Sequence, residues 1–335
     1  MRTMKVTRIE VVLASIVFCT ALGGASGQVA FSQTLAGDSQ QAGSLNVHPA
    51  AGPNRPPNVP DGYVITPFGY FHASCVQSLA KGERLLADGR LQHADGNIEP
   101  NVAVCNYPHY TRSGIPLTAE TNNAPEINGW IESASITTGS ATKSYGALIA
   151  VWTVPPQPSA NDGQVLYFFP GFEDINNVQS ILQPVLAWFQ KEWTLASWNC
   201  CLNGITTNSP AVGVTPGDKI YGSVTSSCPP GTLSCATWNV LSLDLSTGES
   251  TTLSNTPSDG QVFNWAFGGV LEPYYVIKCD DYPPNRQLDF DAITVFNQDL
   301  HPVSSPKWTG SANSTATPQC GYAVKETPHE VTLDY

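Results

Sequence analysis

The stretch VLYFFPGFEDINNVQSILQPVLAWFQKEWTLASW, residues 165–198, decides the fold. It holds two short apolar runs, separated by a Pro-Gly turn and an acidic, Asn-rich connection. Runs of this length bounded by Gly, Pro and Asn are typical of buried strands rather than helices. Alternation along the second run puts Ile181 and Val185 on the face of Gln183, and Leu182 on the other. A buried amide without a partner costs about 1–3 kcal/mol, so we expect Gln183 to bond to a neighbour or to face a ligand.

The sequence after about residue 120 has the same character as this stretch. About 210 residues remain there, a length that a single β-sandwich can fill. Short alternating runs are expected to be strands, with Leu241, Leu243 and Leu245 inward and the intervening Ser242 and Asp244 outward. No sustained helical periodicity is present. Turn signals recur at Pro155-Pro156, Asp162-Gly163, Pro216-Gly217-Asp218, Thr247-Gly248, Asp259-Gly260 and Pro283-Pro284. The pattern predicts an all-β fold, a two-sheet antiparallel β-sandwich.

The first 27 residues have the pattern of a secretory signal peptide. Arg2, Lys5 and Arg8 form a basic start, an apolar stretch covers residues 11–20, and Ala25-Ser26-Gly27 has the small residues expected of a cleavage site. This stretch is too short to span a bilayer, and no second membrane-spanning candidate is present further along the chain. The sequence therefore predicts a secreted, extracellular protein with no membrane association once the signal is removed.

The remaining chain divides by composition. Residues 28–60 are rich in Gln, Ser, Ala, Gly, Asn and Pro, which predicts a flexible leader or linker. Residues 61–120 contain short strand-like runs and turns, which predicts a small β module that packs on the carboxy-terminal remainder of the chain. All eight tryptophans lie in residues 121–335, the predicted sandwich.

Removal of the signal leaves eight cysteines, an even number that predicts a disulfide framework in an exported chain. Cys228 and Cys235 bracket a Pro-Pro-Gly loop and are paired first, followed by Cys75 with Cys105; the other four stay open. Losing the signal also changes the formal charge from −12 to −14, because it takes away three basic residues and one acidic residue. This acidic charge argues against nucleic acid and anionic membranes as partners, and it permits an acidic working pH.

The order of short motifs from residue 128 onward resembles a known family. The motifs are Asn128-Gly129-Trp130, Trp152-Thr153-Val154-Pro155, Phe169-Pro170-Gly171-Phe172-Glu173, Ser180-Ile181-Leu182-Gln183, Thr215-Pro216-Gly217-Asp218-Lys219-Ile220, Leu245-Ser246-Thr247-Gly248-Glu249-Ser250, Gly269-Val270-Leu271-Glu272, Phe290 to Phe296 and Val331 to Tyr335. In order and spacing they resemble the glutamic peptidases of the eqolisin type and, more loosely, the neprosin-like peptidases. The resemblance covers about two-thirds of the chain. It departs from the family at Pro184, at Gly269 and over Ala196–Cys201.

This resemblance implies a concanavalin-like jelly roll and a secreted acid endopeptidase whose catalytic residues are Gln183 and Glu272. Hydrolysis without a metal needs a base for water and a donor for the oxyanion. Glu272 is expected to act as general base and then acid, while Gln183 orients the water and holds the oxyanion. The residues expected to bind substrate or support the site are Trp130, Phe169, Glu173 and Trp188. Each of the six also has a purely structural interpretation, as a packed or solvated side chain.

Other designs find little support. The six histidines are scattered without a zinc-like cluster, so no metal and no cofactor are expected. The expected partner is a protein or peptide substrate, and the expected state is a monomer. The alternative is a non-catalytic, secreted sandwich that binds carbohydrate or protein through Trp188, Trp193 and Trp198. The amino-terminal segment is either a propeptide that makes the chain a zymogen or a permanent accessory module.

Overall fold

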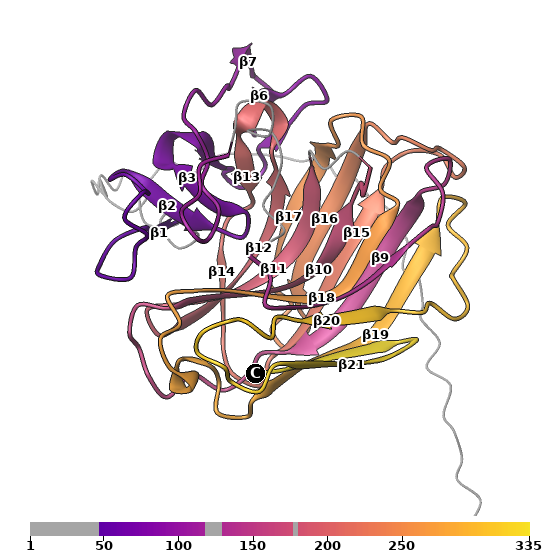
Figure 1. Cartoon of the computed structure of the whole chain (residues 1–335). Coiled ribbons are helices and arrows are strands. Elements are labelled where there is room, and N and C mark those ends of the chain that lie inside the picture. Colours follow the sequence, from indigo (N-terminus) through magenta and orange to yellow (C-terminus); the bar gives the residue numbers. More distant parts are fainter. Residues whose placement is uncertain (1–46, 118–128, 177–179) are drawn as a thin grey trace, which may run out of the picture. The chain divides into compact units, whose positions relative to one another are not determined.

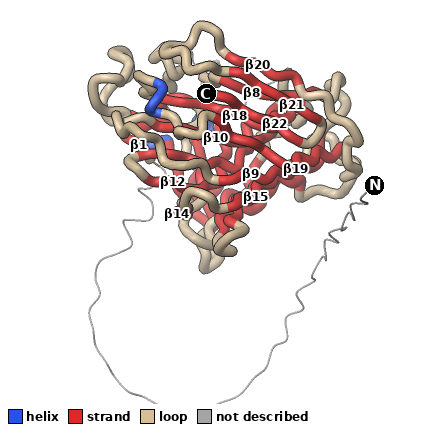
Figure 2. Tube along the Cα trace, turned by 90° about the horizontal axis from the view of Figure 1, so that it is seen from below, coloured by secondary structure: helices blue, strands red, loops and turns tan. Residues whose placement is uncertain are grey.

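A computed structural model describes residues 47–117, 129–176 and 180–335, all within the structural unit Ser39–Tyr335 (Figure 1). The predicted signal peptide and the leader up to residue 46 lie outside the described residues. Strands make up nearly all the regular structure (Figure 2), and the helical segments η1 (Ala73–Cys75), η2 (Leu202–Gly204) and η3 (Cys279–Asp281) are single 3₁₀ turns. No helix in the described ranges is long and apolar enough to cross a membrane.

Two large sheets confirm the predicted all-β sandwich. The nine-stranded sheet runs β20 (Thr309–Ala312), β8 (Glu132–Thr137), β18 (Trp265–Tyr274), β10 (Val165–Glu173), β11 (Ile181–Phe189), β12 (Glu192–Cys200), β13 (Thr206–Asn208) and β4 (Val76–Ser78), with β14 (Val212–Val214) also paired to β12. The seven-stranded sheet runs β17 (Ser250–Pro257), β16 (Thr237–Asp244), β15 (Lys219–Ser226), β9 (Tyr145–Thr153), β19 (Gln287–Asn297), β22 (Glu330–Asp334) and β21 (Ala323–Thr327). All these pairings are antiparallel except β13 with β4.

The amino-terminal module, defined here as residues 47–117, adds two small sheets. One contains β1 (His48–Pro49), β2 (Tyr63–Thr66) and β3 (Gly69–His72), and the other β5 (Arg84–Leu85), β6 (Arg90–Gln92) and β7 (Ile98–Val102). Its strand β4 joins the nine-stranded sheet by pairing with β13, so the module docks directly on the sandwich. The structure also corrects the expected extent of the leader. Residues 47–60 include β1 and the buried Val59, so they belong to the module.

Two apolar cores explain the unbroken apolar runs of the deciding stretch. The first core fills the space between the two large sheets and includes Leu166, Phe168, Leu182 and Leu186. The second lies on the outer face of the nine-stranded sheet, where alternate residues of β10 and β11 pack against the module. Because both faces of these strands are covered, every position of β10 is buried, and its sequence is apolar on both sides instead of alternating.

The expected alternation in β16 is wrong. Ser242 and Asp244 are buried, whereas Leu241 and Leu243 are only half-buried. Ser242 faces the other sheet, where its hydroxyl lies 3.2 Å from that of Ser197 on β12. Asp244 accepts hydrogen bonds from the turn that comes after it. Inward polar side chains are therefore tolerated here because each has a hydrogen-bond partner.

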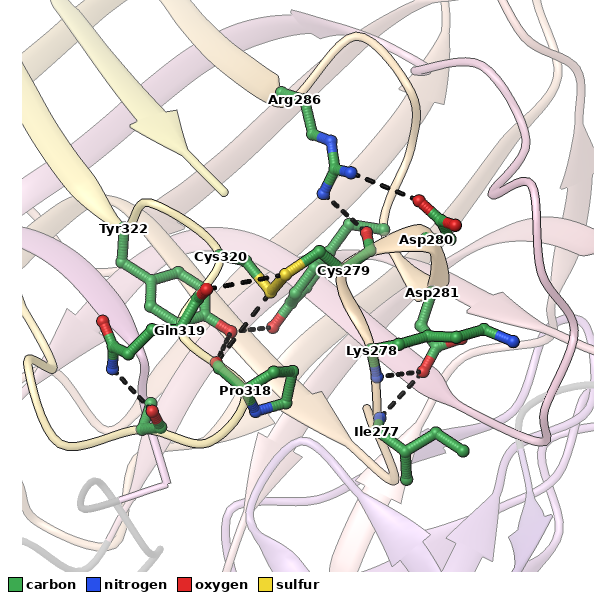
Figure 3. The surroundings of a disulfide bond; sticks show 12 residues. Ile277, Lys278, Cys279, Asp280, Asp281, Arg286, Pro318, Gln319, Cys320 and Tyr322 are labelled. Carbon is green, nitrogen blue, oxygen red and sulfur yellow. Dashed lines mark hydrogen bonds and ion pairs between the residues drawn. A yellow bond between two sulfur atoms is a disulfide. The ribbon is translucent and has the colours of Figure 1, made fainter.

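Four disulfides are present, including the two predicted pairs Cys75–Cys105 and Cys228–Cys235. The remaining pairs are Cys200–Cys201 and Cys279–Cys320. Figure 3 shows the last of these fastening η3 to the segment before β21, next to the ion pair of Arg286 with Asp280. Within the described residues, no disulfide joins the module to the sandwich; the module's own bridge is internal to it.

Candidate functional site

Gln183, Glu173 and Glu272 lie on one face of the nine-stranded sheet. Gln183 alternates with Ile181 and Val185 on β11, and both of these belong to the outer-face core. Glu173 on β10 pairs with Ile181 and so points to the same side. Glu272 on β18 lies between Val270 and Tyr274, which also belong to the outer-face core. The face predicted for Gln183 from alternation is therefore the observed one.

Gln183 and Glu173 are completely buried and lack hydrogen-bond partners. Neither the amide nitrogen and oxygen of Gln183 nor the two carboxyl oxygens of Glu173 have a partner in the described part of the chain. Burial, with the nearby charge of Asp174 adding to the effect, raises the pKa of Glu173 well above its ordinary value. Unsatisfied buried groups cost free energy, so two on one face are typical of a place that receives something else.

Glu272 is equally buried but is held by tyrosines. The hydroxyl of Tyr274 donates to Glu272 Oε1 at 2.5 Å. Tyr167 on β10 is the register partner of Glu272, and burial together with the charge of Glu272 raises the pKa of Tyr167 well above its ordinary value. This end of the face therefore holds a carboxyl group between two phenols. Strand alternation predicts Tyr167 on the face of Phe169, but it was not among the expected site residues.

The strand register separates Gln183 from Glu272. Glu272 pairs with Tyr167, and Tyr167 pairs with Ala187, four residues beyond Gln183 on β11. Two strand spacings of about 4.8 Å and four residues of about 3.3 Å put the two Cα atoms roughly 16 Å apart. Glu173, in contrast, is a diagonal neighbour of Gln183 on the adjacent strand, a relation that places Cα atoms about 7–8 Å apart. The carboxyl group that the fold brings next to Gln183 is that of Glu173.

An aromatic cluster adjoins Gln183 and includes two expected site residues. The ring of Trp130 lies 6.1 Å from that of Phe169, 5.0 Å from Phe267 and 5.8 Å from Trp265. A side chain at Gly171, the position opposite Gln183 when the register is continued, would collide with the backbone oxygen of Leu182 and lie only 2.6 Å from the Phe267 ring. Glycine is required there because the neighbouring strand and this ring both approach the backbone closely.

Trp188 does not belong to this face. It lies in the core between the sheets, 5.1 Å from Trp193, because its position in β11 has the opposite parity to Gln183. This corrects its expected role in binding substrate. Trp198 does lie on the outer face, directly opposite Gln183 in the pairing of β11 with β12. In the sequence analysis Trp198 was grouped with Trp188 and Trp193. It differs from the other two in the face of the sheet that it occupies, and that depends on the odd or even position of each residue within its strand.

The module packs on this face beside Glu272. The hydroxyl of Tyr167 donates to the carbonyl of Ile65, and Tyr274 accepts from the backbone N–H of Gly69. A cavity of about 510 Å³ opens at the margin, lined by Tyr274 together with Tyr70, Arg112 and other residues, but neither Gln183 nor Glu272 reaches it. Groups of three or more His, Cys, Asp or Glu that could hold a metal ion are absent from the described ranges.

Comparisons with known proteins give a limited result. No protein-family model and no curated protein matches the chain. Two crystal structures of Scytalido-glutamic peptidase are similar to it, one with a peptide-based transition-state analogue (16% identity, 62% of this chain, 98% of that chain, TM-score 0.46) and one with a transition-state analogue inhibitor (15%, 62%, 97%, 0.44). A third is SCP-B, a member of the eqolisin family of peptidases, with the tripeptide Ala-Ile-His (16%, 62%, 98%, 0.43). TM-scores below 0.5 establish neither a shared fold nor a shared activity.

Proposed function

We propose that this chain is a secreted, acid-acting endopeptidase made as a capped precursor. The observation that carries the proposal is the pair of Gln183 and Glu173, an amide and a carboxyl group that are fully buried, without partners and diagonal to each other on one face. A donor for an oxyanion beside a carboxyl group for water is the minimum that metal-free amide hydrolysis requires. The motif order, which resembles the glutamic peptidases, supports the same reaction.

The roles follow from the chemistry of the groups. The carboxylate takes a proton from water, the resulting hydroxide attacks the peptide carbonyl, and the amide of Gln183 donates to the oxyanion. The same carboxyl group then returns the proton to the leaving amine. Glu173 is the proposed base because it is the neighbour of Gln183, while Glu272, the base expected from sequence, lines the same face further along.

The module has the properties of a propeptide. Its hairpin contacts Tyr167, Tyr274 and Trp198 on the face where the two glutamates and the glutamine lie fully buried, so we expect a substrate to reach this face only after the module moves. Water entering at that point would lower the raised pKa of Glu173 and allow it to ionise at mildly acidic pH. Four disulfides fit an oxidising, extracellular compartment.

The alternative, a binding sandwich with a tryptophan platform, has less support. Trp188, Trp193 and Trp198 are at most 2% exposed, and the first two lie between the sheets. A stacking surface for sugar needs exposed ring faces. The described residues offer only the half-buried Trp130 and Trp265 on this side.

The test is hydrolysis of a denatured protein by the purified full chain between pH 2 and 6. Gln183→Ala is expected to lower kcat by about 100- to 1,000-fold, the usual effect of losing one oxyanion donor. Glu173→Gln is expected to abolish turnover, and Glu272→Gln to reduce it less. Exposed Glu249→Gln is the matched control.

The outcomes separate the two carboxyl groups. Loss of activity in Glu272→Gln with retention in Glu173→Gln would return the role of base to Glu272. Full activity in Gln183→Ala, or no hydrolysis at any pH after the module has been released, would refute the endopeptidase.

A further inference from the structure

The turn between β2 and β3 inserts into the face that carries Gln183 and Glu272. Phe68, at the tip, is completely buried, and its ring lies 5.9 Å from Trp198 in an edge-to-face arrangement. The tip is ordered by Thr66, whose hydroxyl accepts from the Phe68 N–H at 3.2 Å and donates to the Gly69 carbonyl at 2.9 Å. A turn fixed in this way presents one aromatic side chain in a defined direction.

The backbone of this hairpin is bound by the two tyrosines that flank Glu272. Gly69 donates its N–H to the Tyr274 hydroxyl at 2.9 Å, and that hydroxyl donates to Glu272. On the other side, the Tyr167 hydroxyl donates to the Ile65 carbonyl at 3.2 Å. The face therefore offers one donor and one acceptor to a peptide backbone, in the manner of a site that binds a polypeptide segment.

Phe68 and Gly69 thus contact the two ends of the face. Phe68 contacts Trp198, which pairs with Gln183, while Gly69 contacts Tyr274, which bonds to Glu272. The hairpin supplies no hydrogen bond to Gln183 or Glu173. A substrate that placed a carbonyl group against Gln183 would gain an interaction that the hairpin lacks.

We propose that the Phe68–Gly69 tip occupies the position of substrate, and that the site takes peptides with a large aromatic side chain followed by a residue that presents its backbone N–H. The aromatic side chain fills the space against Trp198, and the N–H of the next residue donates to Tyr274. This inference rests on the proposed function where it calls the bound peptide a substrate. Binding of such a peptide to this face does not itself require hydrolysis.

The second position is defined by the backbone of the peptide. Gly69 is buried and has a positive φ of 103°, a conformation that non-glycine residues rarely adopt and that belongs to the hairpin turn. An extended substrate does not need this φ, and Tyr70, whose ring lies 5.5 Å from that of Tyr274, leaves with the hairpin. The second residue therefore needs a backbone N–H for Tyr274 and no particular side chain.

The experiment measures displacement of the hairpin from the full chain. Amide hydrogen exchange of residues 63–72 is followed while two blocked peptides are added, acetyl-Thr-Pro-Phe-Gly-Tyr-amide and its matched control with Ala in place of Phe. The Phe peptide is expected to accelerate exchange at Gly69 at a concentration at least tenfold lower than the Ala peptide. Equal potency of the two, or no displacement by either, would overturn the inference.

A variant gives a second measurement that needs no added peptide. Phe68→Ala is expected to raise exchange at Gly69 at least tenfold, whereas Val104→Ala, at an exposed position of the same module, leaves it unchanged. Unchanged exchange in Phe68→Ala would mean that the aromatic pocket does not hold the tip. Both readouts are independent of cleavage, so failure of the endopeptidase and failure of this recognition are seen separately.

Discussion

The module and the sandwich bury ionisable groups of opposite kinds. In the module, His48 and His109 are buried, and burial lowers their pKa values to about 3 and about 4. In the sandwich, the buried groups are carboxyls: burial raises the pKa of Glu132 to about 9 and that of Glu173 well above its ordinary range. Protons therefore favour the unfolded or undocked state of the module and the folded state of the sandwich. Acid is therefore expected to weaken docking of the module while it stabilises the sandwich.

The histidines should give the largest effect. Both rings lie where the module meets the sandwich: His48 is 4.3 Å from Phe189, and His109 Nε2 donates to the Gly204 carbonyl at 3.0 Å. Neither has a carboxylate within ion-pair distance in the described part of the chain. With folded-state pKa values below the ordinary 6.5, their contribution is present above pH 6.5 and is lost as the pH falls toward 4.

At about 1.4 kcal/mol per pH unit, each ring should weaken module docking by roughly 3 kcal/mol between pH 6.5 and pH 4. The double variant His48→Phe and His109→Gln keeps the packing and a donor for Gly204, and should remove most of this dependence. Hydrogen exchange across residues 47–117 at several pH values measures it, with exposed His301→Gln as control. An unchanged pH profile in the double variant would break the contrast between the two regions.

Glu132 should give the next largest effect, with the opposite sign. It lies in β8 opposite Leu271, and the charge of Asp334 adds to the burial that raises its pKa. Its contribution is complete below about pH 4.5 and is lost as the pH rises toward 9, so sandwich stability should fall by about 4 kcal/mol from pH 5 to pH 8. Urea unfolding followed by tryptophan fluorescence measures this, and Glu132→Gln should flatten the slope. A wild-type chain more stable at pH 8 than at pH 5 would contradict the expectation.

A small effect should be confined to the module. The hydroxyl of Tyr63 donates to the Pro108 carbonyl at 2.9 Å within the module itself. Tyr63→Phe should cost about 1 kcal/mol, the typical net value of one hydrogen bond. Exchange within residues 47–117 should rise about fivefold while the urea midpoint of the sandwich stays unchanged. Equal losses in both regions would mean that they unfold as one cooperative unit.

Much of the fold could be predicted from the sequence, because short apolar runs and turn residues depend on local chemistry. The face of Gln183 followed from alternation with Ile181 and Val185. The inversion in β16 did not, because the partner of Ser242 is Ser197, 45 residues away in the other sheet. Hydropathy cannot indicate a polar contact between sheets.

The site was harder to predict than the fold. Pairing of Gln183 with Glu272 assumed that their strands meet in one register, whereas Glu272 pairs with Tyr167, four rows from Gln183. The register of β10 with β18 also shifts between Phe169 and Gly171, and such a bulge leaves no clear mark in a single sequence. Trp188 was assigned to the wrong face for a related reason. The face that a residue occupies depends on its position within the strand, which is known only when the ends of the strand are known.

The internal disulfide Cys75–Cys105 has one more consequence. No described disulfide joins the module to the sandwich. A single proteolytic cut between residues 117 and 129 would therefore turn the module from a covalently attached part of the chain into a separate ligand. Before the cut, the tether keeps its effective concentration high and independent of dilution. Afterwards, occupancy would follow mass action, so simple dilution of the nicked protein into its surroundings would favour the open form.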